Sequence, residues 1–266
     1  MAPPRAKAIG ATAMQIFTKM ASRWLERTCD QNECSSFGAA LTETAIGVVS
    51  AHDSYLINCA SPDDFLRKRS IESLMMELKR CDALGLDYLV SHPGNYMDDR
   101  ASGIARNAES ITIAFEQVNP KVMLLLELTA GSGTVLGSTF EEMAAIIERI
   151  PAAWRARVGV CLDTAHVFAA GYDIANRYED VWKQFDDTIG RERLRFMHLN
   201  DSKVPLGSKR DRHELIADGA IGEGAFRRIM NDPTLAAVPK VIETPKLKDA
   251  EATDRRMLEL LRSYIE

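Results

Sequence analysis

Arg157-Val-Gly-Val-Cys-Leu-Asp-Thr-Ala-His166 is a short apolar run that ends in polar residues, and this pattern decides the fold. Val158–Leu162 predicts a buried strand, because uninterrupted β-branched and apolar residues are typical of strands covered on both faces. Six more runs of this kind occur, and successive runs start about 32 to 45 residues apart, the size of a strand–helix unit. They are Thr12–Phe17, Thr44–His52, Asp87–His92, Lys121–Leu128, Leu194–Leu199 and Pro239–Glu243.

Helical patterns lie between most of these runs. The clearest is Asp63–Leu84, where we expect Ser61 as the N-cap, Pro62 at the first helical position and Gly85 as the stop. Alternating strands and helices predict a parallel sheet. The first turns lack a GxGxxG motif, and polar residues follow nearly every strand instead of meeting at one crevice. The sequence therefore predicts an α/β fold, a (β/α)8 TIM barrel. We expect residues 1–266 to form a single domain from which the first barrel strand is missing.

Composition limits the partners of the chain. Its 266 residues include 33 basic and 38 acidic side chains, so the net charge of −5 excludes binding to nucleic acid by excess positive charge alone. The apolar runs are too short to span a bilayer, so we expect no membrane partner, and the missing dinucleotide motif predicts no nucleotide cofactor. The five cysteines contain no CxxC pair, which favours a reduced, cytoplasmic protein without a disulfide scaffold.

Histidines and carboxylates gather at the predicted strand ends. All five histidines lie at or just beyond a predicted strand, or in the long loop after His198. Imidazole and carboxylate are ligands that suit zinc. Nine such groups predict about three divalent ions, which would move the net charge from −5 to about +1 and make the pocket locally positive. The nine are His52, His92, Glu127, Asp163, His166, His198, Asp211, His213 and Glu243.

Each of these residues also has an ordinary structural interpretation. A single histidine is usually hydrogen-bonded or exposed, Asp163 or Thr164 suits a helix N-cap, and Glu127 or Glu243 alone suits a loop. Nine unpaired polar groups at one barrel mouth would, however, cost much desolvation energy. We therefore interpret them together as a metal cluster suited to phosphoester hydrolysis.

Six motifs of the chain contain or adjoin these ligands. They are His52-Asp-Ser-Tyr-Leu-Ile-Asn58, Ser91-His-Pro-Gly94, Cys161-Leu-Asp-Thr-Ala-His166 with Phe168-Ala-Ala-Gly-Tyr-Asp173, His198-Leu-Asn-Asp-Ser-Lys203, Asp211-Arg-His-Glu214 and Ile242-Glu-Thr-Pro245. In this order, and from Gly10 onward, the chain resembles the endonuclease IV family of apurinic/apyrimidinic endonucleases. The resemblance implies a zinc-dependent DNA repair enzyme of the deoxyribonuclease IV type, which cuts duplex DNA 5′ to abasic sites and leaves a 3′-hydroxyl.

The resemblance also implies a partition of the ligands among three zinc ions, with Mn²⁺ able to replace zinc at one position. Hydrolysis would use a metal-bridging hydroxide, which Glu127 would orient as the catalytic residue. The implied ligand sets are His52, His92 and Glu127 for the first ion; Glu127, Asp163, His198 and Glu243 for the second; and His166, Asp211 and His213 for the third.

The implied partner is duplex DNA with abasic sites, bound by a monomer that joins the nucleoid when it acts. Tyr55 and Leu56 resemble family residues that wedge into the duplex, and Arg23 in the loop Lys19–Trp24 resembles a phosphate or stacking contact. A nucleotide without a base is easily extruded, which would give selectivity. A basic stretch near the third ion set is either a solvated loop or a phosphate contact. It comprises Lys203, Lys209, Arg210 and Arg212.

The chain departs from the family pattern at a few positions. Ala165 replaces a cysteine, Leu128 replaces a polar residue and Ala217-Asp218 replaces a glycine turn, and we expect these changes to retune the metals without removing them. The missing first strand would leave an open seam with two unpaired strand edges, which affects stability. Two other functions stay open: a sugar isomerase or epimerase with one or two metals, and a non-catalytic binder of abasic DNA.

Overall fold

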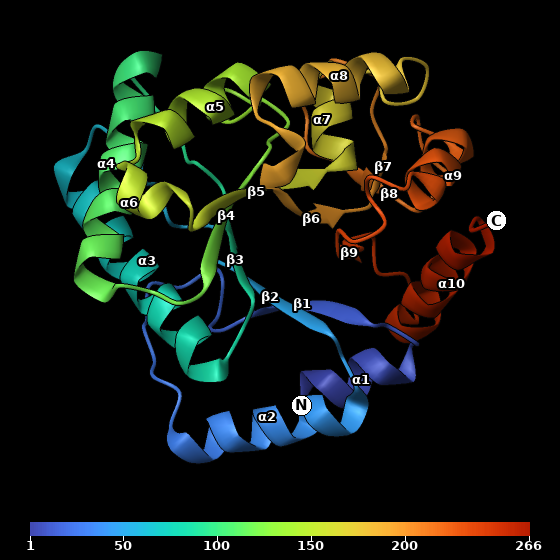
Figure 1. Ribbon diagram of the computed structural model, residues 1–266, viewed down its shortest axis with the longest axis horizontal. Coiled ribbons are helices and arrows are strands. Elements are labelled where there is room, and N and C mark those ends of the chain that lie inside the picture. The colour runs from blue at the N-terminus through green and yellow to red at the C-terminus, as the bar shows by residue number, and fades with distance from the viewer.

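The structure, a computed structural model that describes residues 1–266, contains a curled sheet of seven parallel strands with helices around it (Figure 1). The strand order is β1-β2-β3-β4-β5-β6-β9, and each predicted run contains one of these strands. The fold is a TIM barrel, as expected. The strands are β1 (Ala13–Phe17), β2 (Val48–His52), β3 (Tyr88–Ser91), β4 (Met123–Glu127), β5 (Val158–Asp163), β6 (Leu194–His198) and β9 (Lys240–Val241).

The helices cover the outside of the sheet, and all of them except the first and the last lie in connections between strands (Figure 1). A short 3-10 turn, η1 (Arg191–Arg193), and a two-stranded antiparallel ribbon, β7 (Asp201–Ser202) with β8 (His213–Glu214), lie outside this pattern. No helix is both long and apolar enough to cross a membrane. The helices are α1 (Ala2–Ala8), α2 (Gln31–Thr44), α3 (Asp64–Leu84), α4 (Arg100–Val118), α5 (Phe140–Arg149), α6 (Ala152–Arg155), α7 (Thr164–Ala170), α8 (Tyr178–Thr188), α9 (Glu223–Asn231) and α10 (Ala250–Ser263).

Helix α3 begins later than the sequence suggested. Asp63, not Ser61, is its N-cap, and the Asp63 carboxylate accepts a hydrogen bond from Leu66 N–H at 2.7 Å. Ser61 is buried, and its hydroxyl accepts a hydrogen bond from Asp63 N–H instead, so the expected cap was wrong by two residues. The helix ends as expected at Gly85, whose φ of 67° suits a residue without a side chain.

The apolar core has two parts, because successive residues of a strand face opposite sides of the sheet. The larger part lies between sheet and helices and includes Leu124, Val160 and Phe226. The smaller part fills the barrel interior with one residue from each of five neighbouring strands. These are Val90, Leu125, Cys161, Phe196 and Val241.

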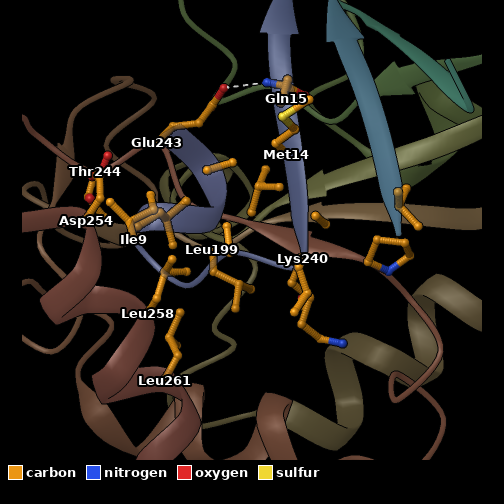
Figure 2. A pocket seen from close by; sticks show the side chains of 18 of the residues that line it. Ile9, Met14, Gln15, Leu199, Lys240, Glu243, Thr244, Asp254, Leu258 and Leu261 are labelled. Atoms are coloured by element: carbon orange, nitrogen blue, oxygen red, sulfur yellow. Dashed lines mark hydrogen bonds between the residues drawn. The ribbon is translucent and has the colours of Figure 1, made fainter. Parts of the chain in front are cut away.

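The barrel has a seam between its edge strands β1 and β9, which lie near each other but share no ladder of backbone hydrogen bonds. The sequence predicted that the first barrel strand is missing, and the gap between β1 and β9 is the position that this strand would occupy. On the outside, Arg255 of α10 donates to the Ala8 carbonyl of α1 at 3.0 Å. At the mouth, Gln15 Nε2 donates to Glu243 Oε1 at 2.8 Å, the dashed bond in Figure 2. A cavity of about 980 Å³ follows the seam, with apolar walls that include Met14 and Leu261 (Figure 2).

Candidate metal centre

The ligand residues at the barrel mouth follow directly from strand periodicity. In β3 to β6 and after β9, each ligand stands two positions after a residue of the inner core, so both side chains point into the barrel. The strand register places ligands of neighbouring strands at the same height along the barrel axis. Asp163 of β5, for example, pairs with His198 of β6. The pairs of core residue and ligand are Val90 and His92, Leu125 and Glu127, Cys161 and Asp163, Phe196 and His198, and Val241 and Glu243.

The first candidate set joins β2, the end of β3 and β4. Glu127 Oε2 lies 3.1 Å from His52 Nε2 and 3.1 Å from His92 Nε2. The ligand atoms of these three residues lie within 4.8 Å of one another. His52 and Glu127 are buried, whereas the His92 side chain is 35% exposed and faces the mouth. This set therefore presents an open side to a molecule approaching from solvent.

The second candidate set is the most enclosed. His198 Nδ1 lies 3.0 Å from Glu127 Oε1, 3.3 Å from Glu243 Oε2 and 3.8 Å from Asp163 Oδ2. All four ligand atoms again lie within 4.8 Å of one another. Glu127 belongs to this set and to the first, because its two carboxylate oxygens point in different directions. The two sets therefore share one carboxylate.

The third candidate set combines the end of β5 with α7 and the start of β8. Asp163, His166 and His213 bring their ligand atoms within 4.8 Å of one another. Asp211 lies against this set, with Oδ2 3.3 Å from His166 Nε2 and Oδ1 3.3 Å from His213 Nε2. Asp163 also caps α7, since its Oδ1 accepts from His166 N–H at 2.9 Å. The cap and the ligand interpretations of Asp163 are therefore both compatible with the structure, through different oxygens.

Negative charge dominates the cluster. Four carboxylates meet here, those of Glu127, Asp163, Asp211 and Glu243, and their ion-pair partners are histidines only. Buried carboxylates without lysine or arginine need another source of positive charge. Divalent cations would supply it while leaving the imidazoles neutral.

The pKa values show the same imbalance. Burial acts to lower the pKa of His52, but the hydrogen bond and the charge of Glu127 outweigh it and raise the pKa to about 9. Burial acts to raise the pKa of Glu127, but the charges of His198 and His92 hold it well below its ordinary value. The hydrogen bond from His166 lowers the pKa of Asp211 to about 2. Without metal, the raised pKa of His52 thus favours a proton that balances the charge of Glu127.

The donor set fits bound metal. His213 Nε2 is buried and has no hydrogen-bond partner, although it faces Asp163 at 3.6 Å and Asp211 at 3.3 Å. The other nitrogen of the ring, Nδ1, lies 3.2 Å from the Glu243 carbonyl oxygen, an orientation that leaves Nε2 free as a ligand. His166 Nδ1 lies 3.0 Å from the Leu128 carbonyl oxygen in the same way. The backbone at Leu128 therefore contacts a ligand whatever side chain stands there.

Two polar residues of the cluster were not expected from the sequence. Gln15, in the apolar run of β1, donates to Glu243 Oε1, and its Oε1 lies 2.9 Å from His198 Nε2. Asn200 donates to Asp163 Oδ2 at 2.6 Å and accepts from Glu243 N–H at 2.8 Å. Both orient candidate ligands on strands far apart in sequence. A polar residue within an apolar strand was the available signal for Gln15, and the His198–Lys203 motif was the signal for Asn200.

The candidate DNA-contact residues stand around the mouth. Tyr55 is 65% exposed, and its ring centroid lies 6.0 Å from that of His52. Leu56 is half-buried and Arg23 is exposed. Of the basic stretch, Lys203 pairs loosely with Glu214 at 3.9 Å, and Lys209, Arg210 and Arg212 form no ion pair. The structure thus places an exposed aromatic ring and free cations beside the cluster.

Comparisons with known proteins agree in fold and family. The model of the xylose isomerase-like TIM barrel family matches residues 3–264. A probable endonuclease 4 from Chloroflexus aggregans is 45% identical, over 98% of this chain and 92% of that protein. A second, from Halorhodospira halophila, is 42% identical over 92% of this chain and 83% of its own length. The solved endonuclease IV of Thermus thermophilus superposes with a TM-score of 0.87 at 34% identity, covering 99% of this chain and 92% of that one. A D-tagatose 3-epimerase-like protein has a TM-score of 0.69 at 16% identity, over 96% and 90%, and shows the shared barrel alone.

Proposed function

The chain belongs to the endonuclease IV family, a family of DNA repair endonucleases, and from this premise we propose that it hydrolyses the phosphodiester 5′ to abasic sites in duplex DNA. The product would end in a 3′-hydroxyl. The observation that supports this proposal best is the cluster of nine histidines and carboxylates at the barrel mouth. Eight of them form three sets that share Glu127 and Asp163, and Asp211 lies against the third set. We propose that residues 1–266 act as one domain and as a monomer.

The three sets would each hold one zinc ion, with Mn²⁺ accepted at one of them. When bound, the ions supply a nucleophilic hydroxide at neutral pH and positive charge against the phosphate and the leaving 3′-oxygen. Glu127 reaches two sets with its two oxygens, so it would hold both ions and orient the nucleophile. Gln15 and Asn200 hold Glu243 and Asp163 in place through their amides.

Selectivity for abasic sites would come from the residues around the mouth. Tyr55 is 65% exposed, and the Phe17 ring supports it at a centroid distance of 5.4 Å. An exposed, supported ring can fill the space of a missing base and stack on its neighbours. Leu56 follows in the chain, and Arg23 is available for a phosphate. A nucleotide without a base gives up little stacking when it turns toward the metal sets.

The test is cleavage of a duplex oligonucleotide that contains one stable abasic analogue. Protein as purified, protein stripped by chelator and protein refilled with zinc are compared on the same duplex, with an undamaged duplex as the control. We expect a single cut just 5′ of the analogue, lost on stripping and restored by zinc, and a metal content of about three ions per chain.

Two other outcomes would contradict the proposal. Binding of abasic duplex without cutting, by protein that holds about three ions, would indicate a non-catalytic reader of damage. A content of about one or two ions, with no cutting and with turnover of a ketose or aldose, would indicate a sugar epimerase or isomerase on the same barrel. Cleavage of the undamaged duplex at an equal rate would contradict the abasic specificity alone.

A further inference from the structure

The segment Thr18–Asp30 follows β1 at the mouth of the barrel and contains no helix or strand. It includes Arg23, and the carbonyl of its Ala21 accepts a hydrogen bond from Ser54, the neighbour of Tyr55, at 2.6 Å. Within the segment, the backbone makes one hydrogen bond to itself, from Arg23 N–H to the Met20 carbonyl at 3.1 Å. Backbone bonding therefore does not determine the shape of this segment.

Side chains of α3 replace the missing backbone bonds. Arg80 Nε donates to Thr18 Oγ1 at 2.7 Å, and Arg80 Nη1 donates to Glu26 Oε2 at 2.7 Å and to the Arg27 carbonyl at 3.0 Å. The remaining nitrogen, Nη2, pairs with Glu77 Oε1 at 2.9 Å. One guanidinium thus contacts the beginning and the end of the segment at the same time.

A second cation completes this arrangement. Lys19 Nζ donates to Glu26 Oε1 at 2.5 Å and to Ser73 Oγ at 3.1 Å, and Ser73 Oγ donates to Glu26 Oε1 at 2.6 Å. Two cations therefore face two carboxylates, and we call this group the anchor cluster. It consists of Thr18, Lys19, Glu26, Ser73, Glu77 and Arg80.

The anchor cluster is buried except for Glu26, which is half-buried, whereas the outer side of the segment is free. Arg80 and Glu77 are 2% and 1% exposed. On the outer side Arg23 is exposed, and Met20 and Leu25 are 59% and 78% exposed. Buried ion pairs add little stability over apolar packing, but they fix one geometry, because each donor must meet its partner. The cluster is thus suited to holding a shape more than to stabilising the barrel.

We propose that Arg80 and Glu26 are positioning residues for DNA binding, because the anchor cluster holds Thr18–Asp30 in the shape that presents Arg23 next to the Ser54–Leu56 segment. This inference rests on the proposed function. A segment ordered in advance loses little entropy when DNA binds, so the anchor cluster lowers the KM for the duplex. The reacting groups at the metal sets are not touched by Arg80 or Glu26.

Two measurements on the variant Glu26→Gln test this inference in the zinc-loaded protein. The substitution keeps the size of the side chain and removes the charge that faces Lys19 and Arg80. Limited trypsin digestion reports the shape of the segment, which contains cleavage sites after Lys19, Arg23 and Arg27. Steady-state cleavage of the abasic-analogue duplex gives KM and kcat. Glu109→Gln is the matched control, because it removes the same kind of charge from an ion pair of α3 outside the anchor cluster. In that pair Arg67 of α3 meets Glu109 of α4 at 2.8 Å.

We expect Glu26→Gln to be nicked in the segment about tenfold faster and to show a KM about tenfold higher, with kcat and metal content within about twofold of wild type. In an Arg23→Ala background the same substitution should change KM by less than about twofold, because both act through one segment. Arg80→Lys, which keeps the charge but not the fork of donors, should give the same pattern. Glu109→Gln should match wild type throughout.

Native nicking and native KM in Glu26→Gln would overturn the inference. So would a KM effect that adds fully to that of Arg23→Ala, or a fall of kcat with an unchanged KM. If wild-type protein cuts no abasic duplex, the proposed function fails and the DNA role of the segment fails with it. The trypsin measurement then still decides whether the anchor cluster fixes the segment.

Discussion

Replacing Glu127 with Gln should remove one ion from the cluster, the one assigned to His52 and His92. The first set depends on Glu127 Oε2, which lies 3.1 Å from Nε2 of each histidine. Without this carboxylate the set retains two ligand residues, fewer than the three that proteins usually provide to catalytic zinc. The second set loses the same carboxylate but retains Asp163, His198 and Glu243.

The magnitude follows from this count. Zinc content should fall from about three to about two ions per chain. The lost ion is worth several kcal/mol of charge stabilisation, so the rate of abasic-site cleavage should fall by about 10³ at roughly 1.4 kcal/mol per factor of ten. The loss of folding stability should be smaller than this loss of charge stabilisation, because Gln fills the same volume as Glu in the buried site.

The assay combines metal analysis of gel-filtered protein with single-turnover cleavage of the abasic-analogue duplex. Glu243→Gln is the matched comparison, because Glu243 belongs to the second set only. That set then retains Glu127, Asp163 and His198, so Glu243→Gln should retain about three ions. A Glu127→Gln protein that holds three ions and cleaves at the wild-type rate would refute the assignment of Glu127 as the shared ligand.

Three further predictions concern the mouth, the cluster and the core. Tyr55→Ala should weaken binding of the abasic-analogue duplex by about tenfold, since stacking on one base is worth about 1–3 kcal/mol, with metal content unchanged; equal affinity in a fluorescence anisotropy titration would contradict the wedge. The raised pKa of His52, about 9, gives the metal-free protein stability that is complete below the unfolded value of about 6.5 and lost as pH rises through about 9. The melting temperature of chelated protein should therefore decrease as the pH rises from about 6.5 to about 9. The melting temperature of zinc-loaded protein should not decrease in this way, because zinc binds neutral imidazole. Equal decreases in the two proteins would contradict this prediction. Phe226→Ala, at a fully buried site in the core, should reduce the free energy of unfolding in urea by about 3–5 kcal/mol, and a loss below about 1 kcal/mol would show that the site collapses around the smaller residue.

The strands and the candidate ligands were predictable because both follow from one period. Alternation along a parallel strand sets which residues face inward, and the polar residue after the last inward apolar residue must lie at the mouth. His92, two positions after Val90, is an example. Because this rule is local, the sequence alone was enough to place the five residues that follow it at the barrel mouth, whereas His166 on α7 and His213 on β8 do not follow it. The assignment of the ligands to particular ions stays a prediction.

Contacts that depend on the closing of the sheet were not predictable in this way. Gln15 meets His198 and Glu243 only because the curled sheet brings β1 toward β6 and β9, across separations of 183 and 228 residues. The anchor cluster joins Glu26 to Arg80 across 54 residues, and each residue alone has the composition of an ordinary surface loop or helix. The cap of α3 was missed for a local reason, since Ser61 and Asp63 both suit an N-cap and only burial separates them.

The seam between β1 and β9 bears on how long a folded molecule survives. A sheet with two free ends can unzip from either of them, and an edge strand can leave without breaking an interior ladder. Glu243 stands at this seam, bonded to Gln15 of the opposite end, and is also a candidate ligand of the enclosed second set. Ions bound as proposed would therefore act as crosslinks that must dissociate before the end of the sheet can peel away. Metal loading would then slow the unfolding rate itself, and the half-life of the protein in a cell would depend on its zinc supply as well as on its equilibrium stability.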